Sequence, residues 1–90
     1  MTAYTIATHP VKDFELWKTA FDSGLEMRQA AGELSAVVIR GGENGNQVTV
    51  INTWANLDQA SAMLNNPDMK PMMEAAGVLE FPTIIMGNSV

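Results

Sequence analysis

The sequence predicts one α+β domain with the ferredoxin-like order β-α-β-β-α-β and an antiparallel sheet. Three observations support this fold class: four β-prone segments, segments between them with helical spacing of apolar residues, and an Asn44-Gly45 pair that predicts a hairpin. Ninety residues suit a single domain covering residues 1–90.

The first strand and the first helix are predicted from the N-terminal third of the chain. Residues 3–9 (AYTIATH) are β-prone, and Pro10 ends regular pairing. Asp13 has the position of a helix N-cap. At about 100° per residue, apolar side chains then occupy one half of the helical wheel over residues 14–31, so we expect one continuous helix. Gly32 has the position of the residue that ends it.

Two residues interrupt the apolar half of this helix, Gly24 and Arg28. A glycine inside a helix costs about 1 kcal/mol relative to alanine, so we expect another group to approach its backbone closely. Arg28 either extends outward to water or meets an anion. The candidate anions are a carboxylate of a partner chain, an acidic ligand, or one of Asp68, Glu74 and Glu80. Pairing with protein is favoured over pairing with a ligand.

Two further strands are predicted over residues 34–40 (LSAVVIR) and 47–54 (QVTVINTW), joined by the loop that contains Asn44-Gly45. Asn56 has capping-box spacing and opens a helix that extends to about residue 65.

The C-terminal part is predicted to hold a short helix and the last strand. Asp68 is expected to cap a helix over residues 69–76 that ends at Gly77. Residues 79–86 (LEFPTIIM) form the last predicted strand, in which Pro82 indicates an edge or a bulge.

The predicted sheet is apolar on both faces, although its helices can cover only one. LSAVVIR and LEFPTIIM have apolar residues at both odd and even positions. A strand with one side in water would instead alternate between apolar and polar residues. A second cover is therefore needed. The economical candidate is a second copy, so we expect a homodimer that packs sheet to sheet into an α+β barrel.

Charge and composition exclude several classes of partner. The net charge is −5 and the five basic residues are scattered, which disfavours binding to nucleic acid or to an anionic membrane. There is no cysteine, and one histidine does not make a transition-metal site, so no metal is expected. The start, MTAYTIATHPVKD, lacks the features of a signal peptide, which predicts a cytoplasmic location.

Three stretches resemble the dimeric α+β barrel superfamily, which includes antibiotic-biosynthesis-monooxygenase-like proteins, haem-degrading monooxygenases and small isomerases. INTWANLDQASAMLNNPDMKPMMEAAG is similar to the part where those families end a strand in Trp and enter a helix. HPVKDFELWKTAFD and AAGVLEFP are similar to a narrower, small subgroup. The resemblance covers nearly the whole chain. It implies the fold and dimerisation, and it is weak for the reaction because the superfamily hosts many chemistries.

The resemblance also bears on cofactors. Trp54 matches the strand-terminal Trp of the oxygenase branches, and Asn52 lies two positions earlier. The haem-degrading members pair that Trp with an Asn on the first strand and a His on the second helix, and this chain has neither. Haem degradation is thus disfavoured, and no cofactor is expected.

The leading functional hypothesis is binding of a small hydrophobic or aromatic molecule in a cavity between sheet and helices, with cofactor-free oxygenase, cyclase or isomerase chemistry as its extension. His9 is the candidate proton acceptor, because imidazole titrates near neutrality. Arg28 is the candidate for stabilising negative charge. The candidate ligand-binding residues are Trp17, Phe21, Asn52 and Trp54.

Two alternatives stay open at this point. For His9 the structural interpretation is favoured over the functional one: a strand-end histidine satisfied by a backbone carbonyl or by Asp13. For the whole domain the second hypothesis is a non-catalytic dimer that senses a ligand or serves as a structural module.

Overall fold

The computed structural model describes residues 1–90 as four strands and four helices, with no helix long and apolar enough to cross a membrane. The elements are β1 (Ala3–Pro10), α1 (Phe14–Ser23), α2 (Leu25–Ala30), β2 (Glu33–Gly41), β3 (Gln47–Trp54), α3 (Leu57–Leu64), α4 (Met69–Ala75) and β4 (Thr83–Asn88).

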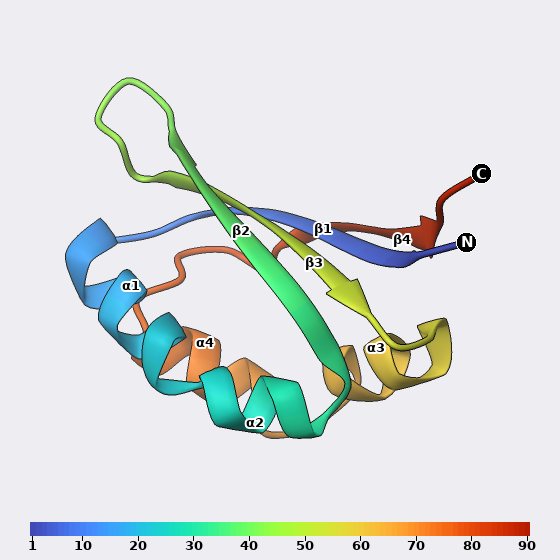
Figure 1. Cartoon of the computed structure of the whole chain (residues 1–90). Helices are drawn as coiled ribbons and strands as arrows, with labels where there is room; N and C mark the ends of the chain where they lie inside the picture. Colours follow the sequence, from blue (N-terminus) through green and yellow to red (C-terminus); the bar gives the residue numbers. More distant parts are fainter.

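The strands form one antiparallel sheet in the order β2-β3-β1-β4, and the helices lie on one side of it (Figure 1). This is the predicted ferredoxin-like arrangement, and it confirms the fold class. The other side of the sheet carries no helix or strand of this chain (Figure 1).

The first helical segment departs from the prediction, because it is broken at Gly24 into α1 and α2. The Arg28 side chain folds back over the break and its Nη1 donates to the Phe21 carbonyl. A Cβ at Gly24 would lie 3.1 Å from that nitrogen. The expected close approach to Gly24 is confirmed. The continuous helix is wrong, because the Phe21 carbonyl accepts from the Gly24 amide, three residues on, and from Arg28.

The second helical segment and the last strand also differ in detail. Asn56 caps α3 as predicted, with its side chain accepting from the Gln59 amide at 2.8 Å. Asp68, in contrast, makes no capping bond to α4. The last strand begins at Thr83 rather than at residue 79, because Pro82 has no N–H to donate to the ladder and the Leu79 amide is bonded to the Pro10 carbonyl instead.

The core on the helix side consists of two buried clusters. One contains Ala3, Trp54, Ala60 and Met63, and the other contains Val11, Trp17, Val48 and Val50. The odd-numbered residues of β1 are paired with the even-numbered residues of β3, so they share one side of the sheet. This side faces the helices, because its residues are clustered with Trp17 of α1 and with Ala60 and Met63 of α3. This register places polar residues of both strands between the two clusters.

The opposite face of the sheet, here called the open face, carries an apolar row across all four strands. Val37 is paired with Ile51, Ile51 with Ile6, and Ile6 with Ile85. The rows on either side hold hydroxyl groups, including the hydrogen-bonded pair Thr8–Thr49. No charged residue lies among the strand positions of this face. The two-faced apolar character predicted from the sequence is therefore present.

Replacing Gly32 by alanine is expected to destabilise the fold by about 1–3 kcal/mol. Gly32 ends α2 with a φ of 108°, and a Cβ there would lie 2.5 Å from Gln59 Oε1 and 2.8 Å from its Cδ. The matched control is Gly87→Ala, where a Cβ would meet nothing within 4 Å. Urea unfolding of both variants measures the difference, and equal stabilities would contradict the prediction.

Candidate functional site

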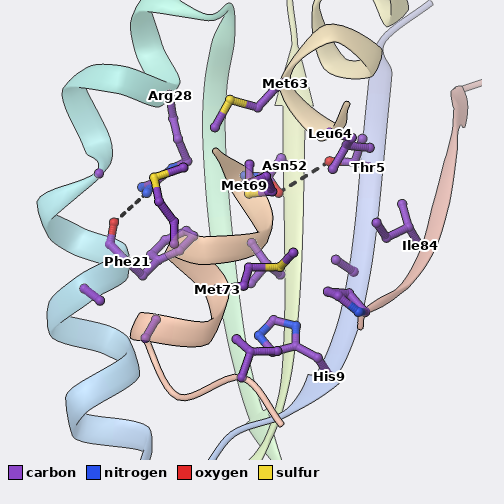
Figure 2. Close-up of a pocket in the computed structure, with 18 of the residues that line it drawn as sticks. Thr5, His9, Phe21, Arg28, Asn52, Met63, Leu64, Met69, Met73 and Ile84 are labelled. Atoms are coloured by element: carbon purple, nitrogen blue, oxygen red, sulfur yellow. Dashed lines mark hydrogen bonds between the residues drawn. The ribbon is translucent and has the colours of Figure 1, made fainter. Parts of the chain in front are cut away.

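A cavity of about 200 Å³ lies between the helix side of the sheet and the helices. Of its 22 lining residues, 16 are hydrophobic. The strands contribute its floor, α1 and α2 one wall, and α3 and α4 a wall rich in methionine (Figure 2). The methionines of this wall are Met63, Met69, Met72 and Met73, and α2 adds Met27 from the other wall. Methionine adapts its shape to a guest, so this wall suits an apolar ligand.

His9 lies at one end of this cavity, near Met73 (Figure 2). Its side chain is buried, with 5% of its surface exposed, and neither Nδ1 nor Nε2 has a hydrogen-bond partner. Asp13 instead accepts the Leu16 amide at 3.0 Å. The alternative in which a carbonyl or Asp13 satisfies His9 is therefore wrong. A neutral imidazole carries one donor and one acceptor nitrogen, and the protein satisfies neither of them at His9.

Burial lowers the pKa of His9 below its ordinary value of 6.5, because the charged imidazolium loses its hydration. The neutral ring is thus the form present at neutral pH. A neutral imidazole is the form that can accept a proton from a bound molecule.

The stability of the protein is expected to fall as the pH drops below about 6.5, and His9 is expected to account for part of that loss. Below this pH the unfolded chain binds a proton at His9 that the folded chain does not yet bind. The contribution of neutral His9 to the free energy of unfolding is therefore complete above pH 6.5. It is lost as the pH falls from there toward the lower pKa of His9 in the folded protein. Urea unfolding at about pH 7.5 and about pH 5 should show a larger loss for the wild type than for His9→Gln. Equal losses would exclude a titrating His9.

Aromatic rings form the wall next to His9. Trp17 lies with its ring centroid 5.6 Å from that of His9 and is stacked on Phe21 at 5.0 Å. Helical spacing on α1 brings Trp17 and Phe21 onto one face. This wall offers a flat, apolar surface to a ring-shaped ligand.

Arg28 forms a buried ion pair with Glu33. Its Nε donates to Glu33 Oε2 at 2.7 Å, and the two side chains are only 11% and 2% exposed. The guanidinium also lies 3.7 Å above the centre of the Phe21 ring. The preference for a protein partner is confirmed, but the partner is none of the three carboxylates expected from the sequence.

A chain of hydrogen bonds continues from Glu33 across the floor of the cavity. Asn52 Nδ2 donates to Glu33 Oε2 at 3.0 Å, and Thr5 Oγ1 donates to Asn52 Oδ1 at 3.4 Å. Trp54 Nε1 donates to Thr5 Oγ1 at 2.9 Å. The donors therefore point in one direction, from the indole to the carboxylate. Such a fully connected network holds each member in one orientation.

All six residues singled out in the sequence line this cavity: His9, Trp17, Phe21, Arg28, Asn52 and Trp54. His9 lies at one end and the group around Asn52 at the other (Figure 2). His9 is four positions after Thr5 along β1, which is about 13 Å at the rise of a strand. The roles assigned to these residues stay predictions.

Two residues of the network, Glu33 and Thr5, were missed by sequence reasoning. Thr5 has the same parity as His9 on β1, so counting faces would have placed it toward the helices. Glu33 stands at the start of β2, five residues after Arg28. An acid next to a helix that carries a buried arginine was the signal available for it.

Comparison with solved structures finds the same fold over nearly the whole chain. A candidate antibiotic biosynthesis monooxygenase from Bordetella bronchiseptica has a TM-score of 0.78 at 15% identity, covering 99% of this chain and 97% of that one. A conserved protein from Methanosarcina mazei Go1 has a TM-score of 0.76 at 14% identity, covering 100% and 94%. SnoaB, a cofactor-independent oxygenase from Streptomyces nogalater, has a TM-score of 0.73 at 14% identity, covering 99% and 95%.

These similarities confirm the resemblance in fold to antibiotic-biosynthesis-monooxygenase-like proteins. At identities of 14–15% they establish the fold alone. No protein-family model matches the chain, and a search of curated proteins gives no match.

Proposed function

We propose that the protein binds a small hydrophobic or aromatic molecule in the cavity beside His9. The observation that carries this proposal is a buried histidine with two unpartnered ring nitrogens in a cavity of about 200 Å³ with mostly apolar walls. An unsatisfied buried polar group is costly, and a ligand with a hydroxyl or carbonyl group would satisfy it. The remaining walls would bury the apolar part of the same molecule.

Cofactor-free chemistry on the bound molecule is the extension of this proposal. His9 would take a proton from a phenol hydroxyl, leaving a phenolate, or from an enol hydroxyl or a carbon next to a carbonyl, leaving an enolate. Cyclisation or isomerisation could proceed from that anion alone, and oxygenation could proceed from it with dioxygen as the co-substrate and oxidant. The support is the neutral state of His9 together with the fold shared with a cofactor-independent oxygenase.

Filling the cavity tests the binding proposal. Ala7 lies on the floor, between Thr5 and His9 on the helix-facing side of β1, so Ala7→Phe would occupy the space of the ligand. We expect binding of the neutral fluorescent probe N-phenyl-1-naphthylamine to the wild type and a loss of at least about tenfold in affinity for this variant. The control is Ala75→Phe, an exposed position of α4 outside the cavity. Equal binding by all three proteins would overturn the proposal.

The chemical extension needs a natural ligand. Native mass spectrometry of protein purified from its own host would reveal one as extra mass. Turnover of that molecule is expected to fall by about 10²–10⁴-fold in His9→Ala, the range of general acid–base catalysis. Unchanged turnover would exclude His9 as the proton acceptor.

A non-catalytic ligand-sensing or structural module is the second candidate. The observation that favours it is the Arg28–Glu33 pair, because an arginine already neutralised by protein is less available to stabilise a negative intermediate. A ligand that copurifies and is returned chemically unchanged would support the module over the enzyme.

We also propose that the protein is a homodimer joined through the open face. Its support is the uncharged face with the row Val37–Ile51–Ile6–Ile85. Val37 and Ile85 are 55% and 65% exposed in the single chain, so water contacts apolar surface that a second sheet would cover. The open faces of two copies can pack against each other across a two-fold axis, the commonest symmetry of protein dimers.

A further inference from the structure

We propose that Glu33 is a specificity-determining residue, which makes the cavity select uncharged ligands over anionic ones. This inference rests on the proposed ligand-binding function. It concerns the charge of the ligand, which the apolar walls alone do not fix. Its basis is the position of Glu33 behind the one charged residue that lines the cavity.

Arg28 is the only acidic or basic residue other than His9 among the residues that line the cavity. By itself, a guanidinium in an apolar wall would attract a carboxylate, a sulfonate or a phosphate. Glu33 does not line the cavity, but its Oε2 is 2.7 Å from Arg28 Nε. The positive charge of Arg28 is therefore neutralised by a carboxylate that lies outside the cavity.

The network holds Glu33 in this position from a second direction. Asn52 donates to the same oxygen, and Thr5 and Trp54 hold the Asn52 amide in turn. A carboxylate fixed by two donors cannot swing aside to release the arginine without leaving Asn52 unsatisfied. An incoming anion would have to displace it or bring a second negative charge into the same buried region.

His9 does not change this balance at the other end of the cavity. It is a neutral ring at neutral pH because burial lowers its pKa. The charges in and behind the walls thus sum to zero, and the groups open to a ligand are neutral hydrogen-bonding groups. An uncharged molecule with hydroxyl or carbonyl groups fits this environment, whereas an anion loses its hydration without gaining a free cation.

Two probes of nearly the same shape distinguish a cavity that selects uncharged ligands from one that accepts anions. They are N-phenyl-1-naphthylamine, which is uncharged, and 1-anilinonaphthalene-8-sulfonate, which adds one sulfonate. The wild type is expected to bind the neutral probe at least about tenfold more tightly. Glu33→Gln keeps the size of the side chain and removes its charge. This variant is expected to bind the sulfonate at least about tenfold more tightly than the wild type, with the affinity for the neutral probe changed by less than about twofold.

The matched control is Glu15→Gln, which changes the net charge equally at a side chain that is 81% exposed. It is expected to leave both affinities unchanged. Adding Ala7→Phe to Glu33→Gln should abolish the gained sulfonate binding, which places the probe in the cavity rather than on the open face. Circular dichroism checks that each variant is folded.

If Glu33→Gln does not fold, Arg28→Gln tests the same idea with the opposite sign. Removing the cation leaves the Glu33 carboxylate without its counter-charge behind the wall, so protonated 1-naphthylmethylamine should gain at least about tenfold in affinity when it competes with the neutral probe. Wild type that binds the neutral probe, with no gain of the charged probe in either folded variant, would overturn the role of Glu33 and leave the binding proposal standing. Wild type that binds neither probe would overturn the binding proposal itself, and this inference with it.

Discussion

Replacing Arg28 by methionine is expected to destabilise the protein by about 3–5 kcal/mol, the range for breaking a buried ion pair by removing one partner. The substitution keeps most of the apolar stem but removes the bond to Glu33, the bond to the Phe21 carbonyl and the contact with the Phe21 ring. Glu33 would then be a buried carboxylate held by Asn52 alone. The free energy of unfolding in urea measures the loss.

Arg40 provides a matched control for this experiment. Its guanidinium also lies over an aromatic ring, 4.3 Å from the centre of Phe14, and it approaches Glu15 at 3.8 Å. The two charged side chains are exposed, so water and salt screen their charges, and Arg40→Met is expected to cost no more than about 1 kcal/mol. Equal losses of unfolding free energy at the two positions would mean that the Arg28–Glu33 pair stabilises the protein no more than the exposed Arg40–Glu15 pair does. Removing both charges in Arg28→Met/Glu33→Gln should recover part of the loss, because no buried charge is then left alone.

The fold was predictable from the sequence because its periodicities are strong. The β-prone segments, the helical spacing of apolar residues, the Asn44-Gly45 turn and the Asn56 cap are each local patterns, so they can be recognised without knowledge of the rest of the fold. The break at Gly24 could not be predicted in the same way. It depends on a long side chain that turns back to reach the Phe21 carbonyl, and helical periodicity does not contain that information.

The start of β4 shows the same limit. Residues 79–82 are as apolar as a strand, but the Leu79 amide bonds to Pro10, which is far away in the sequence. Tertiary contacts of this kind override a local β-preference.

The candidate site was predictable as a set of residues and not as a network. Trp17 and Phe21 follow from helical spacing. His9 is a candidate because the strand end, the proline break and the helix explain the residues around it but require no histidine. The link from Trp54 through Thr5 and Asn52 to Glu33 crosses three strands, so it exists only once their register is known. An irregularity between Glu33 and Ser35 shifts that register, and a simple count of alternation along β2 does not reveal it.

Placing a charge at the centre of the open face is expected to separate the proposed dimer. Ile51 lies in β3, with Val37 beside it on one side and Ile6 on the other. In a two-fold dimer Ile51→Glu introduces two carboxylates into one apolar interface, and each would cost several kcal/mol to bury without a partner. The dissociation constant should therefore rise by at least about a thousandfold.

Sedimentation over a range of concentrations measures this change, and Leu16→Glu is the control. Leu16 lies on α1, on the helix side of the molecule, and is 55% exposed, so the same charge there should leave the dimer intact. A wild type that stays monomeric at high concentration, or an Ile51→Glu variant that still dimerises, would exclude pairing through this face.

The outcome also bears on the cavity, because the sheet that forms its floor has the row Val37–Ile51–Ile6–Ile85 on its other side. If the second copy stiffens that sheet, the monomeric variant should bind N-phenyl-1-naphthylamine more weakly although no residue of the cavity has changed.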